Sequence, residues 1–581
     1  MSVQQEARPH HLWHRHHAEG PDRVEATPWQ RLWQRGIDHY PEPRARYLYL
    51  GITVVSAIVL YYEFYVQASV TPAVMAHFHM TWPFFVYAVV VGNLVGAFAS
   101  LLAGLADRWG RANLVAYGLL ATAAIALFGM PHAPDMWAYA VLYSALGFVE
   151  GIILVATPAL IRDFSPQLGR ASAMAFWTLG PVIASLTVSL VASHTLNHLS
   201  GWNSVGREFL ICGIVGMVVF VIAFLWLREL TPRLRDQLMV SMKDRVLVEA
   251  RAAGVDVEEG LRHPWKQMVK LDTVVSSLGI GVFLVIYYTL IAFLPVFMAS
   301  IFGYSQARAN LLGNWIWAFN AGALVVVGLI SDRARVRKPF MVLGAVVAAV
   351  ATAIFAVITT RADTGYYEFV TVLSILAIGL GFTFSTWLAA YTETVEDVNP
   401  ALTATGLAIW GWVLRIAVGA SLFILPFVVT SMTPLVEHGT QVEAIVAAHP
   451  AEVVTISNID PVTLATLNAN LTNAPAIARA VAEISAAQRV GPGVALQKLI
   501  AVSQVPKAQL AYLNEYGPSV QHAATVAPKE WQRWWWGCFA AELVFLPTIF
   551  LLRGRWSPGK AKRDAEEHER MVQSELRKLA H

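Results

Sequence analysis

Four charged side chains lie inside long apolar stretches of the sequence: Glu63, Glu150, Arg415 and Glu542. A charge at such a position is costly, and it usually binds a ligand, carries a proton or pairs with another charge. A carboxyl group in a low-dielectric environment favours its neutral form, so a buried glutamate can load and release a proton near physiological pH. An arginine stays charged and can attract an anionic group. The chemistry indicated is proton binding beside one fixed positive charge.

The composition places these residues in a membrane. Of the 581 residues, 56% are apolar and 14% are charged, whereas a soluble protein carries about 25% charged residues. This balance excludes a soluble enzyme, a disordered scaffold and a nucleic-acid-binding protein. The two cysteines, Cys212 and Cys538, lie in apolar stretches and exclude a disulfide framework.

The apolar residues form stretches long enough to cross a bilayer as helices, which takes about 20 residues each. We predict an all-α membrane protein with twelve spans in two groups of six. The spans are 48–72, 83–106, 113–130, 136–161, 172–194 and 207–227, then 273–300, 309–331, 339–359, 367–391, 402–431 and 534–552.

The distribution of Lys and Arg predicts the orientation. Of the 42 basic residues, 32 fall in the two tails, the central linker and the connections after even-numbered spans. Cytoplasmic segments carry this excess in membrane proteins, so we expect a cell-membrane protein with both termini in the cytoplasm. Its parts are a tail (1–47), a bundle (48–227), a linker (228–271), a second bundle (272–431 and 534–552), an extracytoplasmic insertion (432–533) and a C-terminal tail (553–581).

The insertion is predicted to contain short helices separated by turns at Pro461, Pro475 and Gly491-Pro492-Gly493. Two interpretations remain open: a packing or lid element on the outer face, or a domain that binds a partner.

The two groups of spans repeat one pattern. Tyr61-Tyr62 in span 1 is matched by Tyr287-Tyr288 in span 7, 226 positions later, and Asp107-Arg108 after span 2 by Asp332-Arg333 after span 8, 225 positions later. The groups are therefore parallel repeats related by an axis along the membrane normal.

The segment Gly104-Leu105-Ala106-Asp107-Arg108-Trp109-Gly110-Arg111 resembles the signature of the major facilitator superfamily (MFS), Gly-x-x-x-Asp-[Arg/Lys]-x-Gly-[Arg/Lys]. The second copy, from Gly328 to Arg335, is degraded. Twelve spans, a six–linker–six layout and the repeat support the resemblance, which is to proton-coupled bacterial-type members. It implies the MFS fold of two pseudo-symmetric six-helix bundles and a conformational latch on the cytoplasmic side. The predicted latch residues are Gly104, Asp107, Arg108, Gly110, Arg111, Asp163, Asp332 and Arg333, with Arg111 able to pair with Asp163.

The resemblance also implies that spans 1, 4, 7 and 10 line a central cavity. Glu63 and Glu150 are then the candidates for proton coupling, and Glu542, in an outermost span, is expected to bond a neighbouring helix. Arg415 is a candidate for substrate binding or for a counter-charge; a purely structural ion pair with a glutamate is the alternative. Candidate substrate contacts from aromatic side chains are Tyr61, Tyr62, Tyr287, Tyr288 and Trp387, although aromatic residues on membrane helices more often pack.

No phosphate-binding Gly-x-x-x-x-Gly-Lys-[Ser/Thr] loop and no hydrolase motif occurs in the sequence, so neither an ATP-driven pump nor an enzyme is indicated. We expect no cofactor and no metal, since the histidines from His10 to His17 lie in a polar tail without fixed geometry. The leading hypothesis is a secondary active transporter that works by alternating access, as a monomer, and imports a small polar or anionic metabolite by proton symport. Two alternatives are proton-antiport efflux of hydrophobic compounds, which the Gly180-Pro181 pair suggests, and a non-transporting sensor or assembly protein that uses the 432–532 region.

Overall fold

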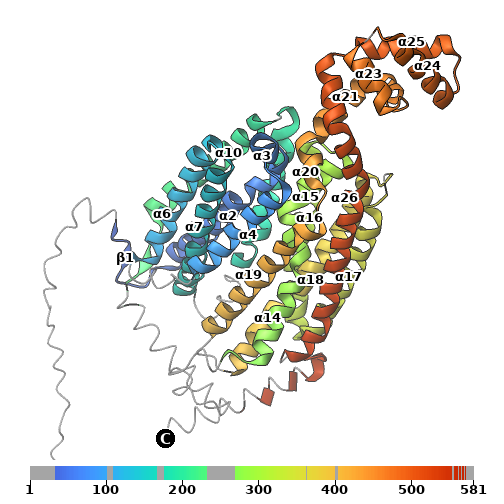
Figure 1. The fold of residues 1–581 in the computed structure, drawn as a ribbon. Coiled ribbons are helices and arrows are strands. Elements are labelled where there is room, and N and C mark those ends of the chain that lie inside the picture. Colours follow the sequence, from blue (N-terminus) through green and yellow to red (C-terminus); the bar gives the residue numbers. More distant parts are fainter. Residues whose placement is uncertain are drawn as a thin grey trace, which may run out of the picture.

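The computed structural model describes residues 33–100, 109–165, 176–199, 201–231, 234, 268–361, 363–398, 403–470, 472–552 and 555–560, with a few isolated positions beyond. Across these residues, twelve helices are long and apolar enough to cross a membrane. They form two bundles side by side, and the insertion stands on one end (Figure 1). We call that end the insertion side and the opposite end, where the chain enters α2, the termini side.

The N-terminal bundle contains six spans, several of which begin at a proline or at a capping side chain. The Asp135 carboxylate, for example, accepts a hydrogen bond from Ala138 N at 2.8 Å at the start of α7. The helices are α2 (Pro43–Ser69), α3 (Thr71–Phe78), α4 (Trp82–Ala99), α6 (Arg111–Ala124) with η2 (Ile125–Gly129) and η3 (Met130–His132), α7 (Met136–Phe164), α9 (Gly180–Thr195) with η5 (Leu196–His198), and α10 (Trp202–Trp226).

The C-terminal bundle repeats this arrangement, and its first span is interrupted at Leu284. The helices are α14 (Leu271–Phe283), α15 (Val285–Phe302), α16 (Gln306–Ala334), α17 (Lys338–Ile358), α18 (Tyr366–Val398), α19 (Thr403–Val428) and α26 (Lys507–Thr548), which ends in η8 (Ile549–Leu551). Large apolar side chains such as Val218, Val350 and Phe427 remain exposed on the outer sides of the bundles. Helices with apolar outer surfaces and internally paired backbones suit contact with lipid.

The insertion is helical, and its helices start at the prolines that mark turns in the sequence: Pro461 opens α23 and Pro492 opens α25. The elements are α20 (Met432–Pro434), η7 (Leu435–Gly439), α21 (Thr440–Ala448), α22 (Pro450–Ile456), α23 (Pro461–Ala469), α24 (Ala474–Gln488) and α25 (Pro492–Gln504). A small core that includes Leu467 and Ile484 holds them together. The helix of the last span starts at Lys507, ahead of the predicted residue 534, so α26 continues from the bundle into the insertion.

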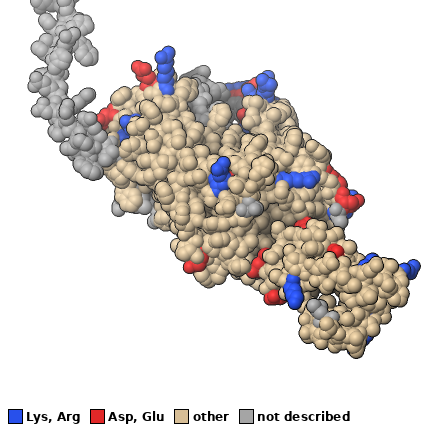
Figure 2. All heavy atoms as spheres, turned by 90° about the horizontal axis from the view of Figure 1, so that it is seen from above, with Lys and Arg blue, Asp and Glu red and all other residues tan. Residues whose placement is uncertain are grey.

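Seen from the insertion side, the molecule carries isolated basic and acidic side chains rather than a continuous patch of one sign (Figure 2). Nothing on this face suggests a polyanion-binding surface, which would gather Lys and Arg along one stripe.

The termini side of the N-terminal bundle is covered by a short strap, which consists of residues 35–37 and 229–231. Strand β1 (Gly36–Ile37) pairs in parallel with β2 (Glu229–Leu230), which follows span 6. Arg35, only 2% exposed, donates hydrogen bonds to Asn113 Oδ1 at 2.8 Å and to Phe224 O at 2.5 Å, and lies 4.6 Å from the centroid of the Phe224 ring. Burial lowers the pKa of this guanidinium, but an arginine with such partners stays charged. Arg35 therefore ties the strap to α6 and α10.

We predict that Arg35→Gln destabilises the N-terminal bundle. The substitution removes charge-assisted hydrogen bonds and leaves buried acceptors unpaired, which costs about 2–4 kcal/mol. Thermal unfolding of the purified protein in detergent should show a lower midpoint. Arg44→Gln, at an exposed position on the same segment, is the matched control; an equal loss in both variants would contradict a specific role for Arg35.

Candidate functional site

Glu150 lies beside a close approach of α4 and α7 that glycines make possible. A Cβ on Gly147 would lie 2.4 Å from Gly92 O, and one on Gly151 would lie 2.2 Å from Gly96 O. A Cβ on Gly96 would also lie 3.4 Å from Glu150 Oε2. Small residues four apart let membrane helices approach closely, and here they fix the helix face that carries the carboxylate.

Arg415 on α19 belongs to the opposite bundle and acts electrostatically on Glu150. Among the described residues, the two side chains form no direct ion pair within 4.0 Å. The Nη1 atom of Arg415 is buried, and it has no hydrogen-bond partner among the residues that the structure describes. A buried donor normally has a partner, so this Nη1 atom can still donate a hydrogen bond to a bound group. We call the interface between the bundles at this point the gap.

Tyrosines surround this pair of charges from both bundles. Glu150, Arg415, Tyr287 and Tyr288 are all electrostatic neighbours of the Tyr61 hydroxyl. On α2 the Tyr61 and Tyr65 rings are 5.5 Å apart, and on α15 the Tyr287 and Tyr288 rings are 5.3 Å apart. Tyr61 of the first Tyr-Tyr pair thus meets both tyrosines of the second pair at the interface. The structure brings together Glu150, Arg415, Tyr61, Tyr287 and Tyr288, and it adds Tyr65; we call these six residues the central cluster.

A small pocket adjoins the central cluster between α2, α9, α15 and α16. Its polar lining comes from Tyr65, Ser69, Ser185, Ser189, Asn310 and Trp317. Sequence reasoning did not single out the two serines of α9, because serines on a membrane helix carry no distinctive signal until the helix rotation is known.

Hydrogen bonds between the bundles gather on the insertion side. Asn310 donates to Ser69 O at 3.0 Å and Asn314 donates to Ser193 Oγ at 3.0 Å. Farther out, Trp82 N donates to Thr433 Oγ1 at 2.9 Å, and His79 Nδ1 lies 2.8 Å from Glu437 Oε1. Toward the termini side, the described contacts between bundles include an aromatic pair, Phe98 and Trp412, with ring centroids 5.8 Å apart. Among the described residues, the bundles are therefore joined by hydrogen bonds on the insertion side.

Other sequence-predicted residues lie away from the interface. Glu63 and Tyr62 point into the N-terminal bundle toward α10, where a Cβ on Gly216 would lie 1.9 Å from Glu63 Oε1. Trp387 packs inside the C-terminal bundle, stacked on Tyr391, and its Nε1 donates to Ser276 Oγ at 3.1 Å. Its geometry is that of a packing residue.

Glu542 on α26 accepts a hydrogen bond from Thr352 of α17 at 3.1 Å. This is the bond to a neighbouring helix that the sequence suggested for it.

The predicted latch is partly described: Gly104, Asp107 and Arg108 lie outside the described residues. Arg111 Nη1 donates to both Asp163 oxygens, at 2.8 and 2.9 Å, and so joins α6 to the end of α7. Gly110 has φ +87°, a conformation that favours glycine. Glu229 of the strap accepts from Arg111 N at 2.8 Å. These contacts all lie within the N-terminal bundle.

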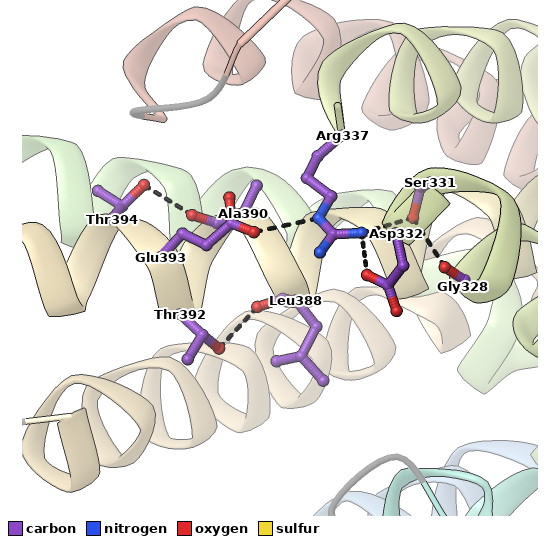
Figure 3. A network of polar contacts seen from close by, with 9 residues as sticks. All are labelled: Gly328, Ser331, Asp332, Arg337, Leu388, Ala390, Thr392, Glu393 and Thr394. Atoms are coloured by element: carbon purple, nitrogen blue, oxygen red, sulfur yellow. Dashed lines mark hydrogen bonds and ion pairs between the residues drawn. The ribbon is translucent and has the colours of Figure 1, made fainter. Parts of the chain in front are cut away.

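The C-terminal bundle has the corresponding network (Figure 3). Arg337 binds Asp332 at 2.6 Å, Glu393 at 3.1 Å and Ser331 Oγ at 2.7 Å. The sequence prediction included Asp332 but missed Arg337 and Glu393, and it named Arg333, which is exposed. The missed signal was the repeat: Arg337 follows Arg111 by 226 positions, the offset of the Tyr-Tyr pairs.

The geometry is that of a twelve-span membrane protein with a charged site between two repeated bundles. A family model described as Major Facilitator Superfamily matches residues 53–436. The chain belongs to the major facilitator superfamily, and the predicted family and fold class are confirmed.

Two curated relatives show partial similarity. The "Glycine betaine/proline/ectoine/pipecolic acid transporter OusA" of Dickeya dadantii (strain 3937) is 25% identical over 354 residues, which are 57% of this chain and 64% of the relative. The "Uncharacterized MFS-type transporter YttB" of Bacillus subtilis (strain 168) is 26% identical over 209 residues, 35% of this chain and 49% of the relative. The chain thus spans less than two thirds of the length of either relative.

Solved structures share the fold. A bacterial homolog to the human lysosomal transporter Spinster, in an inward-facing and unoccupied conformation, matches with a TM-score of 0.54 and 14% identity, over 89% of this chain and 100% of that one. A D-xylose-proton symporter matches with a TM-score of 0.53 and 13% identity, over 66% of this chain and 90% of that one.

We predict that Gly151→Ala weakens the packing of α7 against α4. The new methyl group would meet the Gly96 backbone, and overpacking of this kind costs about 1–3 kcal/mol. Thermal unfolding should report the loss. Gly322→Ala on α16, where a Cβ meets nothing within 4 Å, should leave stability unchanged; if both variants behave alike, the close approach does not hold Glu150 in place.

We also predict that Arg337→Gln loosens the C-terminal bundle more than Arg333→Gln does. Arg337 joins the start of α17 to α16 and α18, whereas Arg333 is exposed. Losing a half-buried arginine with acidic and hydroxyl partners costs about 1–3 kcal/mol. Hydrogen–deuterium exchange of peptides covering 331–341 and 388–395 should speed up in Arg337→Gln, and equal rates in the two variants would contradict the bridging role.

Proposed function

We propose that the chain is a proton-coupled secondary transporter that imports a small polar or anionic solute by alternating access. The observation that carries this proposal is the pair of opposite charges, Glu150 and Arg415, held in different bundles on the two sides of a tyrosine-lined gap. A carboxyl group and a guanidinium so placed couple one proton to one anionic group of a solute.

The coupling follows from charge balance. An ionised Glu150 attracts Arg415 and neutralises it across the gap. When Glu150 takes up a proton, that attraction ends, and the guanidinium is free to hold a carboxylate or another anionic group, for which its donor geometry is suited. Proton and solute then occupy the site together without adding net charge to a low-dielectric region, where an uncompensated charge is costly.

Alternating access needs one side closed at a time. The positive-inside distribution of Lys and Arg supports a cytoplasmic termini side in a cell membrane, and in that orientation the hydrogen bonds of Asn310 and Asn314 close the outer side. The Arg111–Asp163 and Arg337–Glu393 pairs keep the cytoplasmic ends of the two bundles rigid. Each bundle therefore rocks as a unit about the central cluster.

The comparisons favour a polar solute. The curated relative is described as a transporter of glycine betaine, proline, ectoine and pipecolic acid, all small and polar. A protein of the same fold is a D-xylose-proton symporter. Arg415 suits the carboxylates in the first set better than a neutral sugar, so carboxylate-bearing solutes are the first to test.

Efflux of hydrophobic compounds by proton antiport is the second candidate. One observation favours it: Gly180, at the start of α9, faces the Tyr61 ring, which a Cβ there would approach to 3.8 Å. The Gly180-Pro181 pair thus adjoins the aromatic part of the central cluster. The charges of Glu150 and Arg415 are less suited to a hydrophobic compound, and this ranks efflux second.

We predict that Glu150→Gln abolishes proton-driven accumulation in proteoliposomes but retains solute exchange. The amide keeps the size of the side chain and cannot carry a proton, so Arg415 stays available while coupling is lost. The measurement is uptake of radiolabelled proline or glycine betaine under an inward proton gradient, compared with counterflow without a gradient. Glu542→Gln, a buried carboxyl group in α26, is the control and should accumulate solute normally. Undiminished accumulation in Glu150→Gln would falsify the coupling role.

A further inference from the structure

A second cluster of polar groups lies inside the N-terminal bundle, on the other side of α2 from the central cluster. It consists of Tyr62 and Glu63 on α2 and Glu208 and Cys212 on α10, each no more than 1% exposed. The groups are mutual electrostatic neighbours: Tyr62 senses Glu63, Glu208 and Cys212, and Cys212 senses both glutamates. Thr122 of α6 is a polar neighbour of Glu63.

Several atoms of this cluster have no partner. Within the described residues, the Tyr62 hydroxyl and Glu208 Oε2 are buried and make no hydrogen bond, and the buried Glu63 carboxylate has only a weak contact with the Thr122 hydroxyl. An unsatisfied buried polar group costs about 1–3 kcal/mol, and proteins rarely leave several together. Their convergence at one place makes this cluster a candidate for binding exchangeable protons.

The cluster has a shallow end and a deep end. Glu208 accepts a hydrogen bond from Thr195, a half-buried residue at the insertion-side end of α9, and the exposed Arg207 is its charged neighbour. Glu63 lies deeper, against Gly216 and between α2, α6 and α10; only a residue without a side chain leaves room for its carboxyl group there. Tyr62 and Cys212 are each electrostatic neighbours of both glutamates.

We propose that Glu208 and Tyr62 relay protons from the insertion side to Glu63, along a route inside the N-terminal bundle that is separate from the substrate gap. This proposal rests on the proton-coupled transport proposed above, in which Glu150 carries the coupled proton, and it adds Glu63 as a second protonation site with its own supply route. A hydronium ion protonates the Glu208 carboxylate; the Tyr62 hydroxyl accepts that proton while donating its own to the Glu63 carboxylate. Glu208 and Tyr62 return to their starting states, and Glu63 becomes a neutral acid.

A test of the relay must distinguish the two relay groups from the other polar groups around Glu63 and Glu208. The groups around these two glutamates are Tyr62 on α2, Cys212 and Arg207 on α10, and the hydroxyls of Thr122 and Thr195 on α6 and α9. Tyr62→Phe and Glu208→Gln each remove one relay group and nearly preserve its volume, so both variants retain the packing of the bundle.

The experiment is infrared difference spectroscopy of the purified full-length protein in lipid nanodiscs during exchange from H₂O to D₂O. The carbonyl band of a protonated carboxyl group shifts on deuteration, and the band missing from Glu63→Gln is assigned to Glu63. In Glu208→Gln and Tyr62→Phe that band should persist while its exchange slows on the order of a hundredfold, the lower end of what a positioned proton donor contributes. Glu542→Gln, which removes the buried carboxyl group of the other bundle, should leave the exchange rate of the Glu63 band unchanged.

Two results would overturn the proposal: no carboxyl band lost in Glu63→Gln, or unchanged exchange of that band in Glu208→Gln, which means that protons reach Glu63 from the substrate gap. The infrared signal does not depend on transport. If proteoliposome uptake shows no proton dependence while the band behaves as expected, the proposed function fails and the relay stands. If uptake is proton-driven and the band exchanges normally in both relay variants, the relay fails and the proposed function stands.

Discussion

The cost of an ionised group in a low-dielectric interior is the constraint on which this structure depends. Glu150 and Arg415 lie in different bundles, so each offsets the charge of the other only while the bundles keep the right separation. Protonation of Glu150 or arrival of an anionic solute changes that balance. A change of one charge therefore changes the free-energy difference between two relative positions of the bundles. Coupled transport requires such a dependence.

The repeat shows how each bundle is made rigid enough to respond as a unit. In the N-terminal bundle, glycines join α4 to α7, and Arg111 joins α6 to Asp163. In the C-terminal bundle, a Cβ on Gly381 of α18 would lie 3.1 Å from Asn320 O of α16, and Arg337 joins α17 to Glu393. Close backbone contact and an arginine–carboxylate pair thus recur at equivalent places. Both devices join helices of one bundle, which leaves the interface between the bundles to weaker, rearrangeable hydrogen bonds.

The sequence predicts features that depend on composition and residue spacing. It does not predict which side chains reach the interface, because that depends on how each helix is rotated about its axis. The twelve spans, the family and the Arg111–Asp163 pair follow from apolar length, a motif and complementary charge. Glu63 and Glu150 are equivalent in sequence, each a lone acid in an apolar span, yet only Glu150 reaches the interface. Trp387 lies on a cavity helix by span number but packs inward. The strap was missed because Arg35 lies in a basic tail where every arginine looks alike, and two of its acceptors are backbone carbonyls that no sequence pattern marks.

Helix α2 gives the two charged regions a mechanical connection. Successive residues on a helix are about 100° apart, so Tyr61 and Tyr65 lie on one face, toward Arg415, while Glu63 lies nearly opposite Tyr61, toward Gly216 of α10. A proton on Glu63 removes a charge from the interior contact of α2 with α10, and a solute at Tyr61 adds a contact on its opposite face. Because one continuous helix from Pro43 to Ser69 carries both faces, either event shifts the packing of the other. In the proposed transport cycle, two separate binding regions on one helix would thereby influence each other without any direct contact between proton and solute.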